Sequence, residues 1–115
     1  NNAGVSAHAM LSEVHADDLA WYESLMRVNF WSSVWCTHAA LPYLRERQGR
    51  IVAVSSLAGL VGVPGRTAYS ASKYAMTGFF EALRTELARS SEFQPGRAVS
   101  AALERLRRDA FIVRF

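Results

Sequence analysis

Residues 54–73 read VSSLAGLVGVPGRTAYSASK, and this stretch joins an expected strand to an expected helix. It contains three side chains whose chemistry fits together, those of Ser56, Tyr69 and Lys73. Because Tyr69 and Lys73 are four residues apart, a helix places the phenol and the ammonium on one face, one turn apart. A phenol ionises at about pH 10 in water, and a cation within about 4–6 Å favours its phenolate. The pattern predicts a phenol that exchanges a proton beside a serine hydroxyl that holds a substrate oxygen. A Tyr-x-x-x-Lys pair taken alone is more often a solvated lysine beside a half-buried tyrosine.

The flanking segments predict an α/β fold. Ile51–Val54 is a short β-branched run without alternation, which is typical of a parallel strand buried on both faces. Residues 68–89 predict a helix rich in small side chains, and the apolar loop 57–66 before it is either a wall for a hydrophobic ligand or packed against the rest of the fold. In such sheets ligands bind at the carboxyl ends of the strands, where Ser56 lies.

A long helix is predicted over residues 19–47, with Asp17 and Asp18 available to cap it. Its apolar residues cover more than one stripe, which predicts burial by a sheet on one side and by another subunit on the other. Asn29 lies among apolar neighbours, where an amide is costly unless it is satisfied. It either bonds to neighbouring backbone or orders a water. Cys36, also among apolar neighbours, is predicted to be a buried structural thiol.

Composition narrows the class of protein. The 115 residues are 50% apolar and 20% charged, which is ordinary for one globular domain. His8, His15 and His38 show no metal-ligand spacing, so no metal site is expected. Residues 97–115 contain five arginines and two acidic residues, which account for the whole positive excess. A solvated helix face explains this tail better than nucleic-acid binding, so no nucleic acid is expected as a partner.

The pattern changes after residue 89. Residues 90–96 predict a turn, and apolar side chains then recur at helical spacing, at Val99, Leu103, Leu106 and Ala110. Residues 111–115 are either the start of a strand or an apolar end. We therefore divide the chain into a part at 1–89 and a divergent tail at 90–115, predicted to be a turn plus a short amphipathic helix.

Four motifs together carry a family resemblance. They are NNAG at 1–4, RVNF around Asn29, VSSLAG at 54–59 and YSASK at 69–73. Forty residues separate Asn29 from Tyr69, and thirteen separate Ser56 from Tyr69. From residue 1 to about residue 89 the chain resembles the middle and catalytic part of the short-chain dehydrogenases/reductases, and within them the hydroxysteroid dehydrogenase-like branch. The resemblance implies a Rossmann-type doubly wound parallel sheet, incomplete because its N-terminal strands and Gly-rich loop are absent from the sequence.

The resemblance also implies an activity and a role for each matched residue. The activity is NAD(P)-dependent interconversion of an alcohol and a ketone or aldehyde on a hydrophobic, steroid-, retinoid- or lipid-like substrate. Tyr69 would be the general acid or base, and Ser56 would hold the substrate oxygen. Lys73 would stabilise the phenolate and bond the nicotinamide ribose, and Asn29 would position a water leading to Lys73. Residues named for the ribose region of the cofactor are Asn2, Ala3 and Gly4.

Further expectations concern partners and location. The cofactor is NADP or NAD, with NADP favoured, and the protein is expected to form a homo-oligomer, a dimer, through helices 19–47 and 68–89. Because the sequence starts inside a motif and without Met, we expect a fragment of a longer chain that binds a dinucleotide poorly alone. The compartment is left as cytoplasm or the endoplasmic-reticulum membrane, with any anchor preceding Asn1. The alternative function is a catalytically inactive fragment or isoform that acts through subunit interaction.

Overall fold

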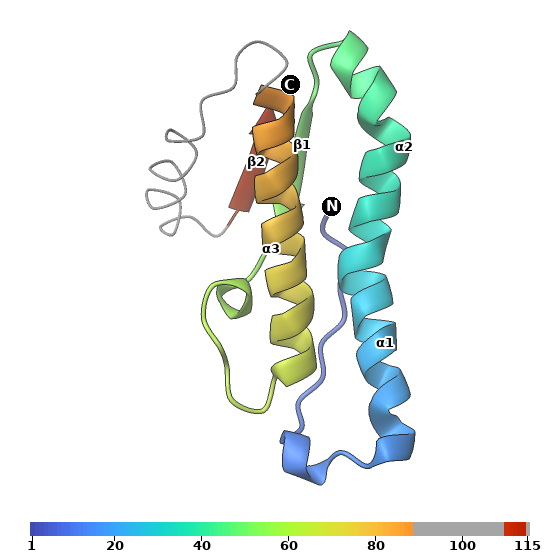
Figure 1. Cartoon of the computed structure of the whole chain (residues 1–115), viewed down its shortest axis with the longest axis vertical. Coiled ribbons are helices and arrows are strands. Elements are labelled where there is room, and N and C mark those ends of the chain that lie inside the picture. The colour runs from blue at the N-terminus through green and yellow to red at the C-terminus, as the bar shows by residue number, and fades with distance from the viewer. Residues whose placement is uncertain (89–109, 115) are drawn as a thin grey trace.

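The computed structural model describes residues 1–88 and the strand at residues 110–114 (Figure 1). The chain runs through a long helical segment, returns along β1 and reverses again into α3, which lies beside β1. The labelled elements are α1 (Ala20–Met26), α2 (Ser32–Glu46), β1 (Arg50–Val54), α3 (Thr67–Ala88) and β2 (Ala110–Arg114). Short 3-10 turns cover Leu11–Glu13, Ala16–Leu19 and Leu57–Gly59, and a π-helical turn at Arg27–Trp31 joins α1 to α2.

Both long helices predicted from the sequence are present. The first begins with a 3-10 turn whose N-cap is His15, so Asp17 and Asp18 lie in the first turn. They therefore favour the helix through its dipole and do not cap it. Helix α2 contains Pro42 and ends before Gln48, which has a positive φ of 49°. The second helix, predicted over residues 68–89, is observed as α3 at Thr67–Ala88.

The prediction that β1 is buried on both faces is wrong for the described chain. Ile51 and Ala53 are buried, whereas Val52 and Val54 are 47% and 41% exposed. The alternation follows from the packing, because α3 covers only the face that carries Ile51 and Ala53. Because both faces of β1 carry apolar side chains, the sequence shows no alternation between apolar and polar residues.

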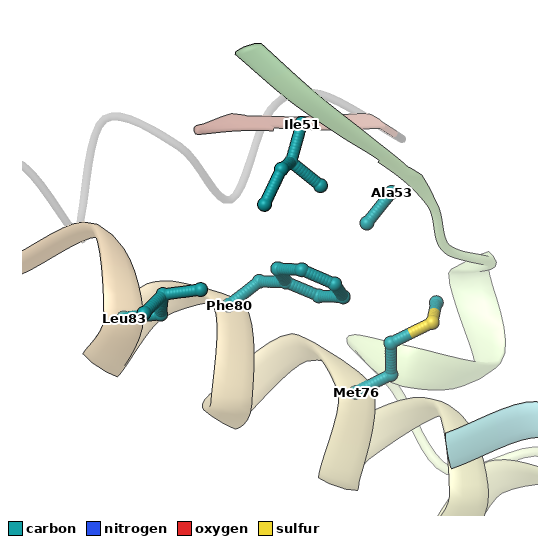
Figure 2. Close-up of a cluster of buried hydrophobic side chains, with 5 residues drawn as sticks. All are labelled: Ile51, Ala53, Met76, Phe80 and Leu83. Atoms are coloured by element: carbon teal, nitrogen blue, oxygen red, sulfur yellow. The ribbon is translucent and has the colours of Figure 1, made fainter. Parts of the chain in front are cut away.

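The core lies between β1 and α3 (Figure 2). Phe80 points from α3 toward Ile51 and Ala53 of β1, and it is 1% exposed. Met76 and Leu83 flank it one turn away on each side of the same helix face. A residue spacing of three to four on α3 thus meets a spacing of two on β1, and this match fixes α3 against the strand that leads to Ser56.

The two edges of β1 have different neighbours. The backbone nitrogen of Asn1 donates to the Val52 carbonyl at 2.8 Å, and the Val54 N–H donates to the Asn1 carbonyl at 3.0 Å. Two bonds that bracket Ala53 in this way are the pattern of neighbouring parallel strands. The other edge pairs with β2 in antiparallel register, Ile51 opposite Val113.

The predicted tail is mostly outside the described residues, as are Val99, Leu103 and Leu106 of the expected amphipathic helix. Its last position, Ala110, begins strand β2 and is not helical, which corrects that part of the prediction. Of the two interpretations of residues 111–115, a strand is the one observed at 111–114.

The long helical segment turns a polar stripe inward and an aromatic one outward. Asn29, Ser33 and Thr37 are at most 4% exposed, whereas Trp31 and Trp35 are 46% and 52% exposed. The two indoles stack on each other, with ring centroids 6.1 Å apart. Cys36 is exposed, so the prediction of a buried thiol is wrong; it lies beside the inward stripe and not on it. Burial on one side of this helix is thus observed in the single chain.

An open groove of about 720 Å³ lies along the outward side of this segment. It is lined by Tyr22, Glu23, Met26, Arg27, Trp31 and Trp35.

None of the helices in the described part of the chain is both long enough and apolar enough to span a membrane.

Candidate active site

Ser56 lies just beyond the carboxyl end of β1 and caps the 3-10 turn that follows. Its backbone is extended, and its hydroxyl oxygen accepts the Ala58 N–H at 3.3 Å. A hydroxyl that accepts one bond still has its own proton to donate. The half-buried Ser56 side chain is therefore held in place by the turn, with a donor left for another group.

Helix α3 brings Tyr69 and Lys73 to the same end of β1. The Lys73 ammonium nitrogen lies 5.8 Å from the centre of the Tyr69 ring. That nitrogen also donates to the carbonyl oxygen of Val54, the last residue of β1, at 3.3 Å. The lysine is 6% exposed and the tyrosine is half-buried. The four-residue spacing thus produces the shared helix face that was predicted from it.

Gly4 lies against the same lysine. A Cβ at Gly4 would stand 3.8 Å from the Lys73 ammonium nitrogen and 3.2 Å from Asn29 Oδ1. A larger side chain at Gly4 would therefore crowd the Asn29 amide and the Lys73 ammonium. Asn2, Ala3 and Gly4 are all exposed, so their backbone is open to a molecule that approaches Lys73 from solvent.

Asn29 is completely buried and makes three hydrogen bonds. Its Oδ1 accepts the Val5 N–H at 2.8 Å, and its Nδ2 donates to the Val5 carbonyl at 2.9 Å and to Ser72 Oγ at 2.9 Å. Of the two interpretations of this amide, bonding to backbone is the one the structure contains, although the backbone is 24 residues distant. Both amide protons are used, so ordering a water through the side chain would fall to the second lone pair of Oδ1.

Ser72 was not identified from the sequence, although it belongs to the site. It is fully buried and donates to the Tyr69 carbonyl oxygen at 2.7 Å while it accepts from Asn29. The chain of bonds from Val5 through Asn29 and Ser72 reaches the backbone of Tyr69. Its position three residues after Tyr69, on the inward side of α3, was the available signal.

Arg66 is a second residue that was missed. Its guanidinium carbon lies 5.7 Å from the centre of the Tyr69 ring, about as close as Lys73.

Within the described residues, no group of three or more His, Cys, Asp and Glu side chains is placed to hold a metal ion.

The sequence profile of a family described as short chain dehydrogenase matches residues 1–109. The chain belongs to the short-chain dehydrogenase family.

Characterised relatives carry the name of one branch. The chain is 45% identical over 86 residues to "11-beta-hydroxysteroid dehydrogenase A" of Sesamum indicum, which is 75% of this chain and 24% of that protein. It is 44% identical over 87 residues to "11-beta-hydroxysteroid dehydrogenase 1A" of Arabidopsis thaliana, again over 24% of that protein. The hydroxysteroid dehydrogenase-like branch predicted from the motifs is thus confirmed, and the chain spans about a quarter of the length of these relatives.

Solved structures share the fold. ElxO with NADP bound superimposes with a TM-score of 0.65 at 26% identity, over 76% of this chain and 35% of ElxO. A 4-hydroxyisoleucine dehydrogenase complexed with NADH and succinate gives the same TM-score at 24% identity, over 77% of this chain and 41% of that one. The Rossmann-type α/β fold is confirmed, with only part of its sheet among the described residues.

Proposed function

We propose that Asn29, Ser56, Tyr69 and Lys73 form the reaction centre of an NAD(P)-dependent oxidoreductase that interconverts an alcohol and a ketone or aldehyde. The observation that carries the proposal is the meeting of Tyr69 and Lys73 on one face of α3 at the carboxyl end of β1. Membership of the short-chain dehydrogenase family supports it. Ser56, at the same strand end, retains a hydroxyl donor for the substrate oxygen.

Each residue has a distinct task in this proposal. Tyr69 gives a proton to the carbonyl oxygen in reduction and takes one from the alcohol in oxidation. Lys73 stabilises the phenolate form of Tyr69. Its ammonium, which the Val54 carbonyl holds at the end of the strand, would bond the ribose of the cofactor. Ser56 orients the substrate oxygen. Asn29 holds the segment that carries Gly4, and the second lone pair of its Oδ1 would order a water toward Lys73. The nicotinamide, when bound, supplies or accepts the hydride.

The cofactor and substrate are part of the proposal. The solved neighbours carry NADH or NADP, which supports a nicotinamide cofactor, and parallel titrations with NADPH and NADH test the preference for NADP. Leu57 and Val61, which follow Ser56, are 61% and 49% exposed. These apolar side chains beside the strand end support a hydrophobic substrate, and the names of the plant relatives favour a steroid-like one.

The test compares Tyr69→Phe with the unaltered residue in the natural protein that carries this chain. With NADPH and a hydrophobic ketone, turnover should fall at least 100-fold, because one proton donor is removed, while NADPH binding is retained. A second arm transplants residues 1–88 into the corresponding segment of the Sesamum relative. A folded but inactive transplant, with the parent active, would contradict the proposal.

A second candidate function has its own supporting observation. The exposed Trp31 and Trp35 and the groove beside them suit a second copy of this chain, as expected for a dimer through helices 19–47 and 68–89. An inactive form that acts through subunit contact would use the same surface. NADPH fluorescence unchanged by the 115-residue chain, together with sedimentation as a dimer, would favour this second function. Sedimentation as a monomer would count against the dimer.

A further inference from the structure

We propose that Arg66 is a positioning residue for the reaction: its guanidinium holds the Tyr69 ring in its working orientation. This inference rests on the proposed function. The guanidinium carbon is 5.7 Å from the ring centre, within the range of roughly 6 Å at which a cation is attracted to an aromatic face. Arg66 lies outside all four motifs that carried the family resemblance.

Arg66 and Lys73 flank Tyr69 in the sequence. Arg66 immediately precedes α3, three residues before the tyrosine, and Lys73 follows the tyrosine by one helical turn within α3. Lys73 is 5.8 Å from the same ring centre. The ring therefore has one cation from the loop that enters α3 and one from the helix itself.

Arg66 is itself fixed in place. One guanidinium nitrogen, Nη1, donates to Ser6 Oγ at 3.1 Å. The Arg66 carbonyl accepts the Ser70 N–H at 2.8 Å, which starts the hydrogen bonding of α3, and its own N–H donates to the Val63 carbonyl at 3.1 Å. Among the described residues no carboxylate pairs with Arg66, so no acidic group competes with the Tyr69 ring for the guanidinium.

The neighbouring backbone supports the same arrangement. The Ala9 N–H donates to the Gly65 carbonyl at 2.9 Å, one residue before Arg66. The segment that follows the NNAG motif is thus tied to the loop that precedes α3 at two adjacent residues. The Ser6 anchor and the Arg66 side chain consequently move together, and the tyrosine is oriented by the first segment of the chain as well as by its own helix.

Loss of this contact should lower the fraction of Tyr69 in the working orientation. A cation–π contact at a partly exposed site is worth a factor of about 2–5 in such an equilibrium. We therefore expect kcat of Arg66→Met to fall about 2- to 5-fold in the natural protein that carries this chain. The Michaelis constant for NADPH should stay unchanged. The melting temperature should fall only slightly, because the bond to Ser6 is lost while the backbone bonds of Arg66 remain.

Two further variants separate positioning from general structural or charge effects. Arg66→Lys keeps a cation and should recover part of the loss in kcat. Arg45→Gln removes an equal charge from the exposed end of α2, and its kcat should equal that of the unaltered protein. An unchanged kcat in Arg66→Met would overturn the inference. A fall in kcat that comes with a large fall in melting temperature would also overturn it, because general loss of structure would then explain the lower kcat.

The failure of this inference is distinguishable from failure of the proposed function. If the unaltered protein turns over and Tyr69→Phe does not, the function stands whatever Arg66→Met does. If the unaltered protein shows no turnover, or if Tyr69→Phe is fully active, the function fails and this inference fails with it.

Discussion

Replacement of Asn29 by alanine should loosen the first segment of the chain from α3. The amide side chain is fully buried and joins the Val5 backbone to Ser72 through three hydrogen bonds. Alanine removes all three and leaves the N–H and carbonyl of Val5 without their partners. The segment that carries Gly4 past Lys73 then has fewer bonds to hold it.

The size of the effect follows from the number of bonds and from exposure. Three neutral hydrogen bonds at about 0.5–1.5 kcal/mol each set a range of about 1.5–4.5 kcal/mol. Val5 is 45% exposed, so water can replace part of what is lost at its backbone. We therefore expect Asn29→Ala to lower the free energy of unfolding by about 1.5–3 kcal/mol.

Two measurements on the 115-residue chain check this expectation. Urea unfolding gives the global loss of stability, and amide hydrogen exchange at Val5 gives the local one, because the Val5 N–H is the group that Asn29 Oδ1 accepts. Ser32→Ala is the matched control, since Ser32 lies on the same helical segment and its hydroxyl bonds only to the Val28 carbonyl of that segment. Its stability should change by less than about 0.5 kcal/mol.

The reasoning is refuted if Asn29→Ala is within about 0.5 kcal/mol of the unaltered chain. Unchanged protection at Val5 would refute it independently, because that result would show that the amide does not hold this segment.

Three further substitutions test the packing. Phe80→Ala should lower the free energy of unfolding by about 3–5 kcal/mol in chemical denaturation, since it empties the centre of the core between β1 and α3. Gly78→Ala should raise it by about 1 kcal/mol, because a Cβ there meets nothing within 4 Å and alanine favours the helix; a loss would show that this face of α3 is covered. Gly65→Ala should destabilise by more than about 1–2 kcal/mol, because Gly65 has a φ of +71° and a Cβ would come within 2.6 Å of His8 Nε2. Equal melting temperatures for Gly65→Ala and the unaltered chain would contradict that conformation.

The local sequence pattern was sufficient to predict the helices and the strand, and to bring Tyr69 and Lys73 of the site together. The spacing of Tyr69 and Lys73 specifies a shared helix face wherever the helix lies, and the β-branched run before Ser56 indicates a strand. Both depend on neighbours in the sequence. The rule that ligands bind at the carboxyl ends of strands in α/β sheets pointed to Ser56, which lies just beyond the end of β1.

Contacts between distant segments could not be predicted in the same way. The bond from Arg66 to Ser6 spans 60 residues, and no local pattern indicates it. The exposed face of β1 was missed because both faces of the strand carry apolar side chains, Ile51 and Ala53 on the buried face and Val52 and Val54 on the exposed one. The polar character of the buried stripe on the long helix was not predicted either. Apolar residues were expected to be buried on two sides, by a sheet and by another subunit, whereas Ser33 and Thr37 are the buried residues of the single chain.

The polar stripe of Asn29, Ser33 and Thr37 has a consequence for alignment. Apolar side chains attract one another at many relative positions, so two helices that meet through apolar faces can slide by one turn at a small cost in free energy. Hydrogen bonds, in contrast, require particular partners. Asn29 meets Ser72 and Ser33 meets Met76, so a slip of one turn along α3 would break both contacts. The polar stripe therefore fixes the position of α3 along the long helical segment. It thereby sets how far beyond the strand the tyrosine and the lysine project.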